Sequence, residues 1–163
     1  MTPKQELISA LQTIPWFQGL DPEYFDKLAG ISSVIELDAG KELFNQGDKQ
    51  DYLYVILKGR VAIEIAVPGK GRTRIYTAEP TEMLGWSSVT PVVHQRTAGA
   101  VTVLPCILIQ MSASELQKLC EENHSFGYLV MRRIANVAAS RLLVTRLQLL
   151  DIFSHSSKEG KNA

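Results

Sequence analysis

The residues best suited to bind a ligand lie close together in residues 83–97. A glycine in this segment lets the backbone approach a ligand, and the free N–H groups of a short helical turn after it would point at an anion. The guanidinium of an arginine adds a planar fork that matches phosphate oxygens, and each charge-assisted hydrogen bond contributes about 1.5–3 kcal/mol. The sequence therefore predicts an anion-binding site with these ligand-binding residues: Gly85, Trp86, Ser87, Ser88, Arg96 and Thr97.

Two of these side chains leave alternatives open. Arg96 either holds an anionic ligand or pairs with a carboxylate in a site that has lost its ligand. Trp86 either stacks on a flat part of the ligand or fills space by hydrophobic packing. The prediction is therefore anion binding at Arg96, with the role of Trp86 undecided.

The elements around this segment have the pattern of a β domain. From residue 32 to about residue 111, strand-like runs with a period of two alternate with glycine turns, which predicts an all-β region. Helical spacing and an Asp21-Pro22 start predict helices within residues 5–30. We expect C-terminal helices over residues 113–153 and a flexible polar tail over residues 154–163. We expect a single domain over residues 1–153.

Turn residues suggest how the strands connect. The run YLYVIL, the turn Lys58-Gly59 and the run RVAIEIAV predict a hairpin. A second turn at residues 68–71 (PGKG) leads into residues 72–77. A third pair of strands, residues 97–103 and 106–111, is interrupted by proline.

A long helix from about Ser125 to Phe153 carries an apolar stripe at a spacing of three or four residues. Such a stripe must be covered, so we expect a homodimer through this helix or docking of another regulatory protein. The arginines of the helix, among them Arg141, are expected to form a solvated face. The predicted dimer or partner residues are Ile134, Val137, Ala138, Leu142, Thr145 and Leu149.

The segment that begins at Gly85 and ends with Arg96-Thr97-Ala98 resembles the phosphate-binding cassette of the cyclic-nucleotide-binding domain family. The bend Asp38-Ala39-Gly40 and the turns Gly47-Asp48 and Lys58-Gly59 also resemble this family over about residues 14–153. The resemblance is to a catabolite-activator-like β-roll, standing alone without a helix-turn-helix. It implies an antiparallel double-stranded β-helix, also called a jelly-roll-like β-roll, flanked by N-terminal helices and a long C-terminal helix.

The chain departs from the family pattern at one position. Where the family has a glutamate that accepts a hydrogen bond from the ribose 2′-hydroxyl, this chain has Trp86, whose indole N–H only donates. Glu82 lies four residues upstream and is either a substitute acceptor or a solvated loop carboxylate. The resemblance therefore implies cyclic AMP or cyclic GMP as candidate ligands, whereas the residues themselves predict only an anion.

Composition restricts the remaining classes of function. Seventeen basic and seventeen acidic side chains cancel, so the overall charge does not attract nucleic acid, and we expect no direct DNA binding. We expect no membrane segment, a cytoplasmic location, and no metal or other cofactor. The two cysteines are expected to be buried thiols. No catalytic motif is recognisable, so an enzyme is not expected.

Two functions remain. The first is a regulatory sensor domain in which an anionic small molecule, such as a cyclic nucleotide, binds between the β-roll and the long helix and repositions that helix. The second is a degenerate cyclic-nucleotide-binding-like fold that acts as a protein-interaction module without a ligand.

Overall fold

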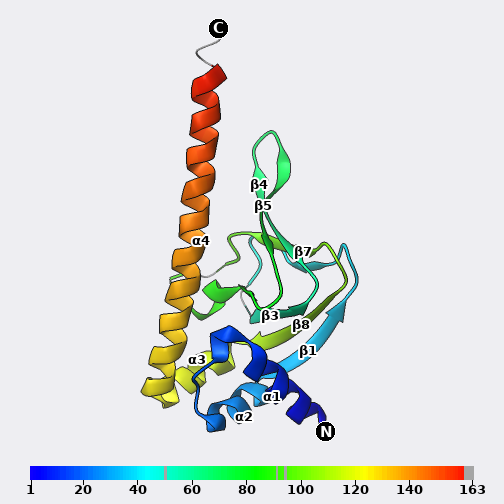
Figure 1. The fold of residues 1–163 in the computed structure, drawn as a ribbon, viewed down its shortest axis with the longest axis vertical. Coiled ribbons are helices and arrows are strands. Elements are labelled where there is room, and N and C mark those ends of the chain that lie inside the picture. Colours follow the sequence, from blue (N-terminus) through cyan, green and yellow to red (C-terminus); the bar gives the residue numbers. More distant parts are fainter. Residues whose placement is uncertain (50, 91, 94, 160–163) are drawn as a thin grey trace.

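Two antiparallel four-stranded sheets pack against each other as a β-roll, with helices at one end and along one side (Figure 1). A computed structural model describes residues 1–49, 51–90, 92–93 and 95–159. The strands are β1 (Ser32–Leu37), β2 (Glu42–Phe44), β3 (Tyr52–Lys58), β4 (Val61–Val67), β5 (Gly71–Ala78), β6 (Met83–Leu84), β7 (Gly99–Thr102) and β8 (Cys106–Ser112). The helices are α1 (Pro3–Thr13), α2 (Pro22–Gly30), α3 (Ala113–Glu122) and α4 (His124–Glu159), with 3₁₀ turns η1 (Pro15–Phe17) and η2 (Trp86–Val89).

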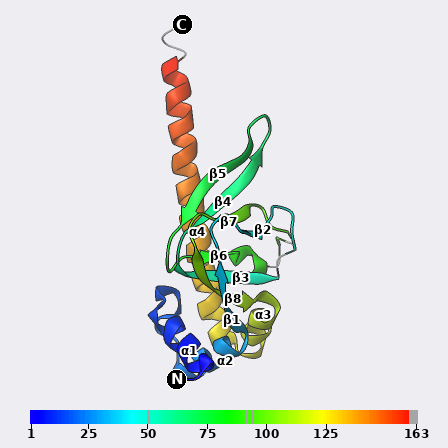
Figure 2. The same cartoon turned by 90° about the vertical axis from the view of Figure 1, so that its right-hand side faces the viewer.

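The sheet order is β1-β8-β3-β6 in one sheet and β2-β7-β4-β5 in the other. The predicted antiparallel β-roll with flanking helices is confirmed. The β4–β5 pairing, which runs from Val61↔Ala78 to Val67↔Gly71, also matches the predicted second turn. This long hairpin projects away from the roll in the same direction as the C-terminal half of α4 (Figure 2).

The predicted hairpin of β3 and β4 is wrong. Strand β3 pairs with β8 and β6, whereas β4 pairs with β5 and β7, so the turn at Gly59 carries the chain from one sheet to the other. The interrupted pair β7 and β8 is divided between the two sheets in the same way. Gly59 has a φ of 96°, and a Cβ there would lie 2.5 Å from the carbonyl oxygen of Pro105. The β3–β4 connection at Gly59 is therefore packed closely against the β7–β8 connection at Pro105, and both connections pass from one sheet to the other.

The hydrophobic core has two parts, separated by the β1-β8-β3-β6 sheet. On β3, Leu53 and Val55 face a cluster formed with the helices, while Tyr54 and Ile56 face a cluster between the two sheets. Because side chains alternate along a strand, β3 is buried on both faces, which explains its continuous apolar sequence.

Helix α4 runs along the side of the roll and extends beyond it (Figure 1). At about 1.5 Å per residue it is about 54 Å long. It continues to Glu159, six residues past the predicted end at Phe153. The hydroxyls of Ser154, Ser156 and Ser157 donate to carbonyls one turn earlier, a hydrogen bond that serine can make within a helix. The rest of the predicted tail, residues 160–163, lies outside the described residues.

In the described part of the chain, none of the helices combines the length and the apolar character that crossing a membrane requires.

Candidate functional site

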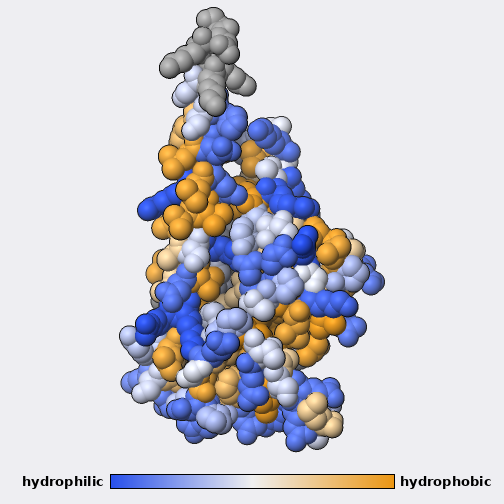
Figure 3. Space-filling view, in the orientation of Figure 1, coloured by the Kyte–Doolittle hydropathy of each residue, from blue (hydrophilic) through white to orange (hydrophobic). Residues whose placement is uncertain are grey.

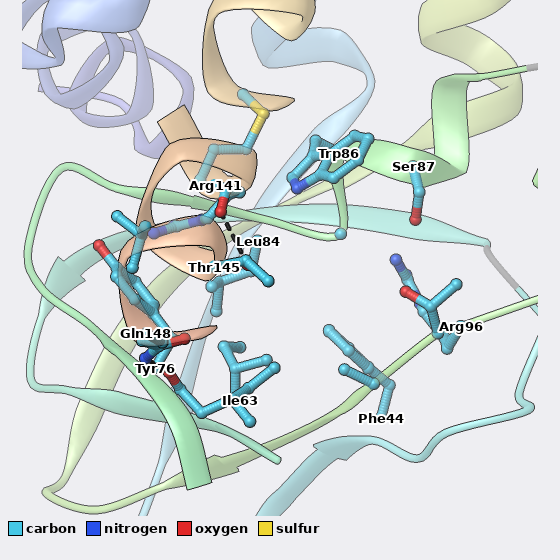
Figure 4. Close-up of a pocket in the computed structure, with 16 residues that line it drawn as sticks. Phe44, Ile63, Tyr76, Leu84, Trp86, Ser87, Arg96, Arg141, Thr145 and Gln148 are labelled. Carbon is cyan, nitrogen blue, oxygen red and sulfur yellow. Dashed lines mark hydrogen bonds between the residues drawn. The ribbon is translucent and has the colours of Figure 1, made fainter. Parts of the chain in front are cut away.

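A cavity of about 200 Å³ lies between the β-roll and α4. Figure 4 shows Ser87 and Arg96 on one side of it, and Arg141 and Gln148 of α4 with Tyr76 of β5 on the other. Its lining is mostly apolar, with two arginines and several hydroxyl groups. The lining residues are Phe44, Ile63, Ile75, Tyr76, Met83, Leu84, Gly85, Trp86, Ser87, Arg96, Thr97, Ala98, Arg141, Val144, Thr145 and Gln148.

Gly85 ends β6 and begins the turn η2 in a left-handed conformation, with a φ of 72°. A Cβ at this position would lie 2.4 Å from Nη1 of Arg96 and 3.0 Å from the carbonyl oxygen of Tyr52. Such contacts are too short for any side chain, so the close approach of backbone and guanidinium requires glycine.

Arg96 is buried, with 4% of its surface exposed. Its Nη2 donates to the carbonyl oxygen of Tyr52, and its guanidinium carbon lies 4.2 Å from the ring centre of Phe44. Nε and Nη1 are buried and have no hydrogen-bond partner among the residues that the structure describes. Burial lowers the pKa of Arg96 because the charged form loses its hydration.

The backbone fixes this arginine in place. The N–H of Arg96 donates to the carbonyl of Asp48, and the N–H of Gly47 donates to the carbonyl of Arg96, both at 2.8 Å. The Gly47-Asp48 turn therefore anchors the strand segment that carries the guanidinium.

The other predicted ligand-binding residues are not all in the cavity. Trp86, Ser87 and Thr97 line it together with Gly85 and Arg96. Ser88 is buried on the other side of η2, where it lines a separate surface hollow with Asp51 and Gln117. Pro91, which follows this turn, lies outside the described residues. Five of the six predicted residues are thus brought to one cavity, and Ser88 is turned away from it.

Glu82 lies outside this cavity, in a neighbouring hollow of about 500 Å³ that Trp16 and Arg133 also line. Its Oε1 accepts from the hydroxyl of Tyr76 and, at 3.2 Å, from Nη1 of Arg141. Its Oε2 accepts from the backbone N–H of Glu79 at 2.6 Å. Both oxygens already have partners within the protein, so Glu82 is neither a solvated loop carboxylate nor a lining residue of the cavity.

The sequence predicts that the long helix borders the ligand site, but it does not identify the α4 residues that line the cavity. The sequence predicts a solvated face for Arg141, but its guanidinium carbon lies 3.8 Å from the ring centre of Tyr76 and it pairs with Glu82. Thr145 donates to the carbonyl of Arg141, and Gln148 donates to the carbonyl of Ile75 at 2.6 Å. Positions 141, 145 and 148 share one helix face, and this spacing is the signal that could have identified them.

The predicted interface residues of α4 lie on different faces. Ile134 is buried in the core of its own domain, and Val137 lines the hollow beside Glu82. Leu142 and Leu149 are exposed at 52% and 48%. The stripe therefore covers both the contact with the roll and the outer face of the helix.

Metal-ligating side chains do not gather in the described residues: no group of three or more His, Cys, Asp or Glu is placed to hold an ion. The two cysteines are free thiols in this part of the chain, Cys106 buried and Cys120 half-buried.

Comparison with known proteins identifies the family. Residues 34–123 match the sequence profile described as "Cyclic nucleotide-binding domain". The chain is 25% identical over 136 residues to the CRP-like cAMP-activated global transcriptional regulator of Mycobacterium tuberculosis, an alignment that covers 83% of the chain. It is 28% identical over 120 residues, 74% of the chain, to the Pycsar effector protein XpPycTIR of Xanthomonas perforans. The chain spans 58% and 37% of the length of these two relatives.

A solved structure supports the same assignment of fold. The cyclic nucleotide-binding domain from Methylobacillus flagellatus superposes with a TM-score of 0.76 at 23% identity, covering 91% of this chain and 83% of the other. The family profile covers more than half of the sequence and includes both Gly85 and Arg96. The chain therefore belongs to the cyclic nucleotide-binding domain family.

Proposed function

We propose that this protein is a regulatory sensor domain that binds an anionic small molecule, a cyclic nucleotide in the simplest case, in the cavity between the β-roll and α4. The observation that carries the proposal is the state of Arg96. Its guanidinium is buried at the cavity, and two of its nitrogens have no partner among the described residues. A bound anion would supply the missing acceptors.

The energetics support an anion at this place. A buried cation loses its hydration, and the loss is offset only if nearby groups complete its hydrogen bonds. Tyr52 and Phe44 offset part of it, through one carbonyl and one ring face. An anion that accepts from Nε and Nη1 would add two charge-assisted hydrogen bonds in a poorly hydrated site. The apolar walls around it would receive a flat organic body.

We further propose that α4 transmits the signal. The cavity of about 200 Å³ is smaller than the roughly 300–1,000 Å³ of typical ligand sites, so a nucleotide-sized ligand would displace part of the wall. The α4 wall, with Arg141 and Gln148, is held to the roll by few polar contacts. A ligand that contacts both walls would favour one position of α4 over another.

The outer face of α4 suggests that a second copy of the chain receives this signal. Figure 3 shows hydrophobic side chains along the upper half of α4. Leu142 and Leu149 are one heptad apart, and Phe153 follows them on the same face, exposed at 65%. We propose that these three side chains form the seam of a homodimer.

Titration calorimetry with cyclic AMP, cyclic GMP and inorganic phosphate would test the sensor. We expect heat of binding with at least one of them, and Arg96→Met should weaken that binding by at least about a hundredfold, as two lost charge-assisted hydrogen bonds imply. Arg60→Met is the matched control, because Arg60 is a surface arginine paired with Glu79. Absence of heat and of a thermal shift with all three compounds would refute the sensor.

Sedimentation velocity would test the dimer. Leu149→Glu should convert dimers to monomers, because a charge in the seam loses its hydration without a partner. Leu104→Glu is the control, since Leu104 is an equally exposed leucine, at 47%, in the β7–β8 connection. A wild-type chain that sediments as a monomer at all concentrations would refute this part.

One observation favours the alternative, an interaction module without a ligand. Arg96 already has a carbonyl and a ring as partners, and Trp86 occupies part of the cavity wall where the family has a carboxylate. In that case Arg96→Met would change neither ligand binding nor the mobility of α4, while binding to a partner protein would persist.

A further inference from the structure

We propose that the cavity recognises the hydrogen-bond acceptors and a flat apolar face of its ligand. We further propose that a hydroxyl group of the ligand next to the anion contributes little to binding. For a cyclic nucleotide this hydroxyl is the ribose 2′-OH, so 2′-deoxy and ribo forms should bind alike. The inference rests on the proposed sensor function and specifies its ligand class.

The composition of the cavity wall is the first support. Sixteen residues line it, and among these described residues there is no aspartate or glutamate, whereas two are arginines. Arg141 pairs with Glu82 from the neighbouring hollow, so the positive charge in the wall that has no carboxylate partner among the described residues is that of Arg96. A ligand gains from bringing acceptors and loses from bringing donors that need a strong acceptor.

The polar groups near the anion position are chiefly donors. Nε and Nη1 of Arg96 are N–H groups that have no acceptor among the described residues. Trp86 also lines the cavity, and its indole nitrogen, which faces Arg141 in Figure 4, can only donate. The hydroxyls of Ser87 and Thr97 complete this end, and a neutral hydroxyl is a weaker acceptor than a carboxylate.

The nearby carboxylates do not reach this position. Glu82 faces the neighbouring hollow, where its oxygens accept from Tyr76, Arg141 and the backbone of Glu79. The negative charges of Asp51 and Asp48 act to raise the pKa of Arg96, but neither residue lines the cavity. Asp48 also accepts from the N–H of Asn45 at 2.8 Å. A ligand hydroxyl beside Arg96 would therefore find no carboxylate.

Acceptor oxygens do exist at the other end, on α4. In Figure 4 Gln148 and Thr145 lie away from Arg96, across the cavity. Donor groups on the ligand can find acceptors there, whereas the anion end offers only the weaker acceptors of Ser87 and Thr97. The cavity should therefore respond to amino groups on the far side of the ligand more than to a hydroxyl next to the phosphate.

A comparison of cyclic AMP with 2′-deoxy cyclic AMP on the wild-type protein tests the inference directly. A site built to accept a hydroxyl rejects the analogue that lacks it by large factors, whereas here we expect dissociation constants within about threefold of each other. A larger preference for cyclic AMP would overturn the inference and leave the sensor proposal standing. If neither compound nor inorganic phosphate binds, both proposals fail.

Two substitutions at one position sharpen the test. Trp86→Gln adds an acceptor oxygen to the cavity wall without adding charge, and it should create a preference for cyclic AMP of about tenfold, the worth of one hydrogen bond. Trp86→Phe keeps a flat apolar side chain and should leave the two compounds equal. If folded Trp86→Gln protein shows no preference, the hydroxyl lies away from Trp86 and the inference is wrong.

Discussion

Replacing Gly85 by alanine adds one methyl group at the point where the backbone approaches Arg96, and we expect it to weaken anion binding strongly while the protein remains folded. The new Cβ would lie 2.4 Å from Nη1 and 3.1 Å from Cζ of the guanidinium. The arginine cannot turn aside without leaving the carbonyl of Tyr52, to which Nη2 donates. The substitution should therefore displace the whole guanidinium from the cavity.

The magnitude has two parts. A left-handed conformation costs a residue with a Cβ roughly 1–2 kcal/mol relative to glycine, and Gly85 has a φ of 72°. Overpacking against Arg96 and the Tyr52 carbonyl adds about 1–3 kcal/mol. The total, on the order of 2–5 kcal/mol, is smaller than the stability of most domains. The loss of two charge-assisted hydrogen bonds to the anion lowers affinity by on the order of a hundredfold.

Gly69→Ala is the matched control. Gly69 has a φ of 79°, but a Cβ there would have no neighbouring atom within 4 Å. It should therefore show the conformational cost alone. Urea unfolding gives both free energies, and calorimetry with cyclic AMP and phosphate gives both affinities. If Gly85→Ala and Gly69→Ala unfold alike and bind alike, the close approach of Gly85 to Arg96 is not what holds the anion site.

Three further predictions concern the scaffold. Gly59→Ala should destabilise the fold by more than about 3 kcal/mol, measured as a lower Tm than that of Gly69→Ala, because its Cβ would lie 2.5 Å from Pro105 O and 2.6 Å from Cys106 Sγ at a φ of 96°. Arg133→Gln should lower the unfolding free energy by about 1–3 kcal/mol, since Arg133 donates to the carbonyls of Trp16 and Gln18; anion affinity should not change. Burial raises the pKa of Cys120 to about 11, so its alkylation at pH 8 should be about a hundredfold slower than that of a free thiol and should accelerate on unfolding; a rate equal to that of free cysteine would contradict the burial.

The half of the cavity around Arg96 could be predicted from the sequence because its determinants are local. Gly85 and Arg96 both belong to one short segment, and a glycine turn followed by an arginine is typical of an anion site. Strand connectivity was harder. The run that forms β3 is apolar on both faces, because a helix cluster covers one face and a sheet covers the other. Such a run gives no sign of which strand lies beside it, and the short turn at Gly59 suggested the wrong neighbour.

The α4 residues that line the cavity could not be predicted for a different reason. Arg141 and Gln148 are polar residues on a helix, which is typical of a solvated face, and Thr145 belongs to the stripe that the sequence assigns to a dimer or partner. Only the tertiary contact with Tyr76 and Ile75 turns this face inward. The departure at Trp86 was visible in the sequence, but its consequence was not. The structure adds that Glu82 is already bonded elsewhere and that no carboxylate lines the cavity in the described residues.

The buried guanidinium also links stability to binding. Arg96 has two partnerless nitrogens among the described residues, so replacing it by methionine removes an incompletely paired charge while keeping a long side chain. Buried charges replaced by apolar residues often leave a protein equally or more stable. We therefore expect Arg96→Met to unfold at the same temperature as the wild type, or a higher one, without ligand.

Ligand should reverse this order. A ligand at a hundred times its dissociation constant stabilises the wild type by about 2.7 kcal/mol, and the variant gains almost nothing if its affinity falls a hundredfold. Thermal unfolding of both proteins with and without cyclic AMP would show whether the wild type becomes the more stable of the two only when the ligand is present. If Arg96→Met unfolds several degrees below the wild type without ligand, then the guanidinium stabilises the fold through Tyr52 and Phe44, and its burial is no longer evidence for an absent anion.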